Sequence, residues 1–187
     1  MKVVVSGVCV SVFLSFLPQP LAAERLVNGA RFGAWTVSCE ALAVNETVCV
    51  LSQRLVRAND GGLLADLLAF AGAEAPSAWV AARLPNGVYF PAGFSLRADD
   101  PEAGEDRIVA FEWQSCSPEI CEALVEVDTE TASAFEMLPE WVAAYSPAID
   151  AEPLVFRMDP SGLQEGLVAL ATAMGHPDPF ATPSQAE

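Results

Sequence analysis

The stretch that decides the fold is AWTVSCEALAVNETVCVLSQRLV, residues 34–56. Its two ends, Ala34–Ser38 and Thr47–Val56, are rich in Val, Thr and Leu with partial alternation, which is typical of β-strands. A polar segment separates them, so the pattern predicts two antiparallel strands joined by a turn. Cys39 and Cys49 fall near that junction, where a disulfide would hold the two strands together.

Outside the first 23 residues the chain carries four cysteines, most simply two disulfides: Cys39, Cys49, Cys116 and Cys121. Their separations do not match the C-x2-C spacing of zinc sites or thiol oxidoreductases. Four cysteines allow three pairings, and we expect Cys39–Cys49 and Cys116–Cys121 because short loops close readily. Each bridge should then add roughly 2 to 3 kcal/mol of stability. A redox role for residues 116–121 is the minor alternative.

The N-terminal segment Met1–Ala23 begins with one lysine, continues through an apolar run and ends with prolines and two alanines. That order is typical of a signal peptide and predicts cleavage after Ala23. A membrane anchor is the alternative, but the run is shorter than the roughly 20 apolar residues that a bilayer core requires. Cys9 lies inside the apolar run and would leave with the signal.

The remaining 164 residues suit one domain, which we place at 24–176, with a flexible tail at 177–187. This part contains eight arginines, no lysine and 25 acidic residues, for a formal net charge of −17. Such a field repels nucleic acid and anionic lipid, so we expect neither as a partner, nor stable membrane insertion after cleavage. A cationic partner is favoured, although acidity that only serves solubility is the more common explanation.

Further strands are predicted along the chain. The clearest pattern is a hairpin, in which Trp79–Leu84 and Val88–Ala98 flank the turn Pro85-Asn86-Gly87. Leu63–Phe70 is apolar and could be a strand or a short helical turn. The other expected strands are Arg107–Gln114, Cys121–Val127 and Pro153–Met158.

Two helices are expected in the C-terminal third. Asp128 can cap a short helix that runs through Met137. Ser161 and Gln164 fit a capping box, and apolar residues then recur with helical spacing as far as Met174. The second segment is therefore predicted to be an amphipathic C-terminal helix.

No constellation of residues specifies a reaction, a cofactor or a metal. His176 is the only histidine and lies beside a proline-rich tail, which disfavours a Ser-His-Asp relay and a metal centre. The acidic segment Asp99–Asp106 could offer oxygen ligands to calcium, but its spacing does not fit an EF-hand. We expect a solvated loop there. The tryptophans are expected to fill the core rather than stack on a sugar or peptide: Trp35, Trp79, Trp113 and Trp141.

A set of short motifs is spread over most of the chain after residue 23. They are Phe32-Gly33-Ala34-Trp35-Thr36-Val37-Ser38-Cys39-Glu40, Cys49 with Gln53, Leu84-Pro85-Asn86-Gly87-Val88, Ala92-Gly93, Cys116 with Cys121-Glu122-Ala123, Val127-Asp128, Gly162-Leu163 and Ala169-Leu170. Together these motifs resemble those of the invasion-associated locus B (IalB) family of exported bacterial proteins. The chain departs from the family pattern at Ile120, where a glycine is common, and in having no lysine after the signal.

This resemblance implies a mainly β protein: an immunoglobulin-like β-sandwich with a C-terminal amphipathic helix and two disulfides, and with no assigned catalytic residues. Some family members are linked to the entry of bacterial pathogens into host cells. Our leading hypothesis is a non-enzymatic periplasmic or secreted binding protein for a protein or envelope component, using a sheet edge or end loops. The alternatives are an accessory subunit of a periplasmic envelope complex and, third, an enzyme.

Overall fold

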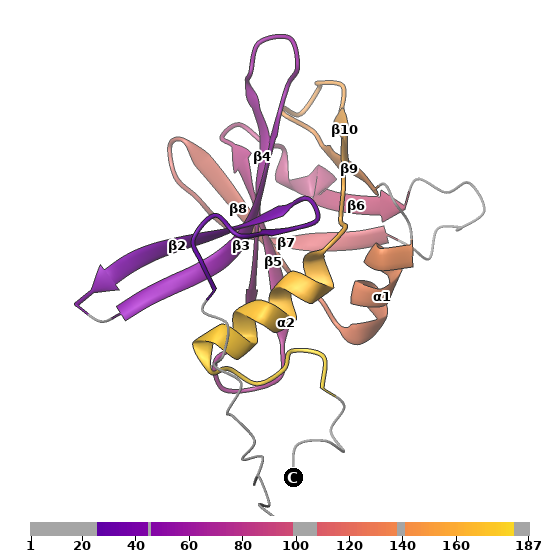
Figure 1. Cartoon of the computed structure of the whole chain (residues 1–187). Helices are drawn as coiled ribbons and strands as arrows, with labels where there is room; N and C mark the ends of the chain where they lie inside the picture. The colour runs from indigo at the N-terminus through magenta and orange to yellow at the C-terminus, as the bar shows by residue number, and fades with distance from the viewer. Residues whose placement is uncertain (1–25, 45, 99–107, 138–140, 182–187) are drawn as a thin grey trace, which may run out of the picture.

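The computed structural model describes residues 26–44, 46–98, 108–137 and 141–181. Within these ranges, ten strands form one antiparallel sheet in the order β1-β2-β3-β4-β5-β8-β7-β6-β9-β10 (Figure 1). The elements are β1 (Arg31–Phe32), β2 (Trp35–Ala43), β3 (Glu46–Val56), β4 (Leu63–Ala71), β5 (Ala78–Pro85), the 3-10 turn η1 (Phe90–Ala92), β6 (Phe94–Ala98), β7 (Ile108–Cys116), β8 (Ile120–Glu126), α1 (Thr129–Met137), β9 (Trp141–Tyr145), β10 (Leu154–Met158) and α2 (Leu163–Met174).

The two strands of the opening stretch are β2 and β3, as predicted. Leu63–Phe70 lies in a strand, β4, and not in a helical turn, and Leu154–Met158 forms β10. Three of the predicted segments lie outside the described residues. They are the signal segment 1–23, the acidic loop Asp99–Asp106 and the end of the tail, residues 182–187.

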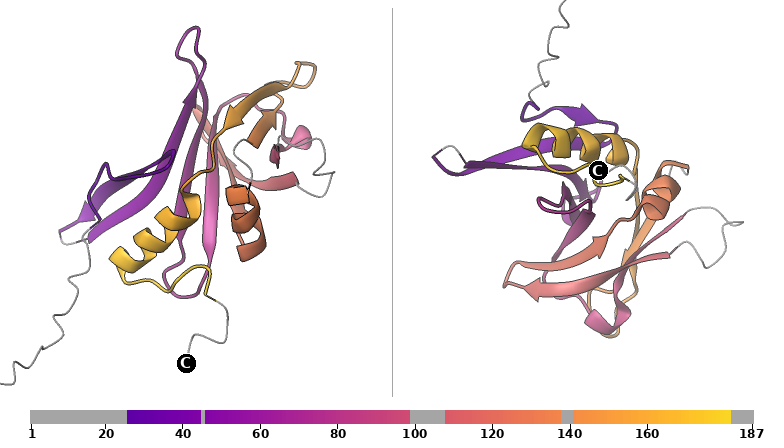
Figure 2. Two further views of the ribbon diagram at one scale, coloured as in Figure 1. Left: turned by 45° about the vertical axis from the view of Figure 1, so that its right-hand side comes forward. Right: turned by 90° about the horizontal axis from the view of Figure 1, so that it is seen from below.

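Strand β7 connects the two halves of the sheet. Its first part, Ile108–Phe111, pairs with β6, whereas Glu112–Cys116 pairs with β8. The register shifts between Trp113 and Ser115, and such a bulge bends a strand. The sheet therefore turns a corner at β7, and β6, β9 and β10 lie beside the longer strands rather than in line with them (Figure 2).

The core lies on the inner face of the bent sheet. The largest fully buried side chains include Trp35 and Phe94, and the rings of Phe135 and Trp141 meet edge to face with centroids 4.6 Å apart. Helix α2 covers β3 and β4, with Leu163, Gly166, Leu167, Leu170 and Ala171 buried. Small residues on α2 permit this close approach, since a Cβ on Gly166 would lie 2.7 Å from Leu51 Cδ1.

The predicted hairpin between Trp79–Leu84 and Val88–Ala98 is wrong. β5 and β6 are both strands, but β8 and β7 lie between them in the sheet. The turn at Asn86 is hydrogen-bonded to another turn instead, because the Asn86 N–H donates to the Glu119 carbonyl at 3.0 Å. The chain then enters η1, which contains a proline, and crosses over before it becomes β6.

The predicted capping box at Ser161 and Gln164 is also wrong. The N-cap of α2 is Gly162, with φ of +83°, and no side chain caps the helix. The Ser161 N–H instead donates to Asp159 Oδ1 at 2.8 Å. The Ser161 carbonyl also accepts the Ala34 N–H at 3.1 Å, so this turn belongs to the contact between α2 and the start of β2.

The other helix begins as expected, because Asp128 Oδ1 accepts the Thr131 N–H at 2.7 Å at the start of α1. At the other end of the chain, packing continues beyond residue 176. Pro179 is buried and Phe180 packs against the core, so the part of the predicted tail nearest α2 is in contact with the domain.

Candidate functional site at the Cys116–Cys121 end of the sheet

The described part of the chain contains two disulfides, and each joins residues directly opposite one another on neighbouring strands. Cys39 of β2 pairs with Cys49 of β3, and Cys116 of β7 pairs with Cys121 of β8. Both Cα–Cα separations are 4.0 Å. Directly opposed positions on antiparallel strands bring Cα atoms close together, so one bridge joins the strands of the β2–β3 hairpin and the other joins those of the β7–β8 hairpin.

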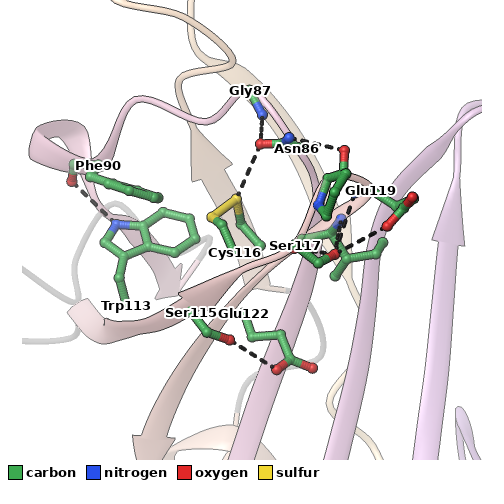
Figure 3. The surroundings of a disulfide bond; sticks show 12 residues. Asn86, Gly87, Phe90, Trp113, Ser115, Cys116, Ser117, Glu119 and Glu122 are labelled. Carbon is green, nitrogen blue, oxygen red and sulfur yellow. Dashed lines mark hydrogen bonds between the residues drawn. A yellow bond between two sulfur atoms is a disulfide. The ribbon is translucent and has the colours of Figure 1, made fainter.

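Asn86 links the second disulfide to the end of β5 (Figure 3). Its Nδ2 donates to the Pro118 carbonyl at 2.9 Å, and its Oδ1 accepts the Gly87 N–H at 2.7 Å. The same Oδ1 lies 3.6 Å from Cys121 Sγ. This last contact involves no proton, since a disulfide sulfur carries none. One amide side chain therefore holds two turns together.

The turn between β7 and β8 is closed by Ser117. The Glu119 and Ile120 N–H groups both donate to Ser117 Oγ, at 3.3 and 3.1 Å, and the Ser117 N–H donates to the Ile120 carbonyl at 2.8 Å. Backbone groups thus occupy this hydroxyl, which forms part of an ST turn. A nucleophilic role would require breaking these bonds.

An aromatic pair stands beside the disulfide. Phe90 of η1 and Trp113 of β7 have ring centroids 5.1 Å apart at a tilt of 48°, and Trp113 Nε1 donates to the Phe90 carbonyl at 3.2 Å (Figure 3). Phe90 is 49% exposed, whereas Trp113 is half-buried. An exposed ring on a braced support is the kind of group that anchors protein interfaces. We call Phe90 and Trp113 the aromatic pair.

The four tryptophans have three different environments. Trp35 and Trp141 are fully buried, as predicted for core residues, and Trp113 packs at the margin of the core. Trp79 is not a core residue, because it lies on the outer face of the sheet between the buried Ala78 and Val80. Its strand partner there is Phe70, so these two aromatic side chains lie next to each other on the outer face of the sheet.

A cavity of about 610 Å³ lies between the N-terminal segment and α2. Its lining is mainly apolar, with one carboxylate and one hydroxyl: Leu26, Val27, Ala30, Phe32, Glu165, Val168, Ala169 and Thr172. His176, just after α2, does not line it. A hydrolytic active site needs an acid, a base and a nucleophile, and the carboxylate and hydroxyl of this cavity do not supply all three.

Neither a metal-binding cluster nor a helix suited to crossing a membrane occurs in the described ranges. No group of three or more His, Cys, Asp or Glu side chains there is arranged to hold a metal ion. No described helix is both long and apolar enough to cross a membrane.

Comparison with known proteins decides the family. The family model for "Invasion associated locus B (IalB) protein" matches residues 35–171. The chain belongs to the IalB family. The crystal structure of invasion associated protein B from Bartonella henselae has the same fold, with a TM-score of 0.62 and 16% sequence identity over 78% of this chain and 96% of that one. No curated protein sequence matches this chain.

The IalB motif residues meet at the turn before α2. A Cβ on Gly33 would lie 2.2 Å from the Ser161 carbonyl oxygen, and Gln53 Nε2 donates to the Asp159 carbonyl at 2.7 Å. Residues from β3 and from the turn between β1 and β2 therefore fix the position of the final IalB helix. Sequence reasoning missed Phe90, because nothing in the pattern distinguishes an exposed phenylalanine from a buried one.

Proposed function

We propose that this IalB-family chain is an exported, non-enzymatic binding protein that is either periplasmic or secreted. We further propose that it contacts its partner through the Cys116–Cys121 end of the sheet. The observation that carries this proposal is the aromatic pair, because its exposed ring stands beside a turn braced by a disulfide and by Asn86. Rigid exposed aromatics lose little conformational entropy on binding.

Export is supported by the oxidised cysteines. Structural disulfides form and persist outside the cytoplasm. The apolar N-terminal run with its Ala22-Ala23 end supplies the matching signal.

The absence of enzymatic activity is part of the same proposal. Ser117 Oγ is occupied by two backbone N–H groups, and the only histidine follows α2. We also propose that the fold is an immunoglobulin-like β-sandwich, and the corner that the sheet turns at β7 supports this description. The partner we propose is a protein or envelope component with a cationic surface, in view of the net charge of −17 after residue 23.

The test begins with the full chain produced in its own bacterium. Intact-mass measurement of the periplasmic and released fractions should give a chain that starts at Glu24. Retention of residues 1–23 in a membrane fraction would count against a released protein.

The contact surface is tested with Phe90→Ser, and Val27→Ser provides the matched control because Val27 is 66% exposed on the N-terminal segment beside α2. Both variants should keep the wild-type Tm, and only Phe90→Ser should lose capture of envelope proteins from the same cells. Equal capture by both variants would contradict the proposed surface. A stable high-mass assembly would favour an accessory subunit of an envelope complex.

A further inference from the structure

The β2–β3 hairpin continues past the Cys39–Cys49 disulfide and projects from the rest of the molecule (Figures 1 and 2). We call its described residues 40–44 and 47–48 the arm. Three of its apolar side chains face solvent: Leu42 is 60% exposed, Val44 92% and Val48 38%. Several exposed apolar side chains on one projecting element are typical of an interaction site.

The outer edge of β2 is covered only along its first part. The Val37 N–H donates to the Ala30 carbonyl at 2.8 Å, and the Cys39 N–H donates to Asn28 Oδ1 at 3.1 Å. β1 pairs only with the start of β2, and the Ala30 N–H donates to the Val27 carbonyl at 2.9 Å in a turn that places Leu26 and Val27 beside α2. From Ala41 onward the edge therefore has no neighbouring strand among the described residues, and such an edge can accept one.

The charge of the arm restricts what can bind there. Residues 32–53 contain no lysine and no arginine, but they include Glu40 and Glu46. An anionic membrane and a second copy of this acidic chain would both bring like charge to the arm. A strand that carries arginine or lysine would bring the opposite charge, while its apolar residues would cover the exposed Leu and Val side chains.

We infer that the arm binds an extended segment of a partner protein, in which apolar residues alternate with arginine or lysine, as an added strand along β2. This inference rests on the proposed binding function and gives it a second contact surface, separate from the aromatic pair. In such a pairing the backbone groups of β2 supply hydrogen bonds, and alternate side chains supply specificity. The disulfide at the base keeps the arm in register.

The probes are synthetic twelve-residue peptides that alternate Val with Arg, a matched Val/Glu peptide, and a Val/Arg peptide with prolines that remove backbone donors. The Val/Arg peptide should bind the mature wild-type protein, and the Val/Glu and proline peptides should not. Leu42→Ser/Val44→Ser should weaken binding about tenfold or more. The matched control is Ile149→Ser/Val155→Ser, at sites 69% and 64% exposed outside the arm, and it should bind as wild type.

Several outcomes overturn the inference. They are no binding of the Val/Arg peptide, equal binding of the Val/Glu peptide, equal binding of the proline peptide, or wild-type affinity in the arm variant. Binding to phosphatidylcholine vesicles that depends on Leu42 and Val44 would instead assign the arm to a lipid surface. A dimer in sedimentation that the arm variant abolishes would assign it to a second copy.

The Phe90→Ser variant separates this inference from the proposed function. It should bind the Val/Arg peptide normally, because Phe90 is not part of the arm. If Phe90→Ser captures envelope proteins normally while the arm variant loses the peptide, only the proposed end surface fails. If the arm variant keeps the peptide while Phe90→Ser loses capture, only the arm inference fails.

Discussion

Two glycines, Gly33 and Gly162, allow the turn before α2 to approach the turn between β1 and β2 closely. Gly162 has φ of +83°, and a Cβ there would lie 2.3 Å from the Phe32 carbonyl carbon. We expect Gly162→Ala to lower the free energy of unfolding by about 3 kcal/mol, since it adds a backbone clash to an unfavourable φ. Urea denaturation at pH 7 measures this loss.

Gly175→Ala is the control for that measurement. Gly175 has a similar φ of +71°, but no heavy atom of the described residues lies within 4 Å of its added Cβ. It should cost only about 1 kcal/mol, from the backbone conformation alone. Equal losses in the two variants would show that close packing against Phe32 adds nothing.

Asp128 at the start of α1 links stability to pH. The hydrogen bond from the Thr131 N–H lowers the pKa of this carboxyl below its ordinary value of 3.8. Because the folded state favours the ionised form, the stabilisation is complete above the unfolded value and is lost as pH falls through the lower folded pKa. Asp128→Ala should cost about 1 kcal/mol at pH 7 and less at low pH.

Asp128→Asn provides the comparison, because asparagine caps a helix but does not titrate. It should stay close to wild type at pH 7 and lose this part of the pH dependence. Unfolding curves between pH 7 and pH 3 for the three proteins check this expectation. A wild-type curve parallel to that of Asp128→Ala throughout would contradict it.

At the scale of elements, each disulfide joins the two strands of one β-hairpin. Cys39→Ser/Cys49→Ser should lower the free energy of unfolding by roughly 2 to 3 kcal/mol, because the bridge closes a short loop of the unfolded chain. It should also speed amide exchange in the arm while leaving β4 and β5 unchanged. Non-reducing peptide mapping of the wild type should give the pairs 39–49 and 116–121, and a 39–116 pair would contradict the arrangement.

Elements with strong local patterns were predictable from sequence. Apolar and polar residues partly alternate in β2 and β3, and Asp128 caps α1. Interactions between residues close in sequence are therefore sufficient to predict these elements. The hairpin at residues 79–98 failed because the partner of Asn86 lies on a turn more than 30 residues away. The Cys116–Cys121 disulfide between β7 and β8 could be predicted from the sequence. The exposure of Phe90 could not be predicted, because it depends on tertiary packing.

At the scale of the whole molecule, charge should govern encounter. The chain after residue 23 carries 25 acidic residues and eight arginines, and exposed charges are screened over roughly 8 Å at physiological salt. Association with a captured partner should therefore slow as ionic strength rises, while dissociation changes less. Stopped-flow or surface measurements at low and high salt test this. A flat dependence would assign the acidity to solubility alone.

The order of the strands also sets the order in which an emerging chain can fold. β1 to β5 follow one another both in the chain and in the sheet, so this half can assemble from its N-terminal end. The second edge of β5 pairs with β8, which is synthesised only after β6 and β7. Until β8 is present, this edge of β5 has no partner strand. The alternate residues between Ala78 and Leu84 that are buried in the folded protein then lie next to an unpaired edge. Slow emergence of β8 after β5, during export, would therefore prolong an unpaired strand edge, which is a site where aggregation is expected to begin.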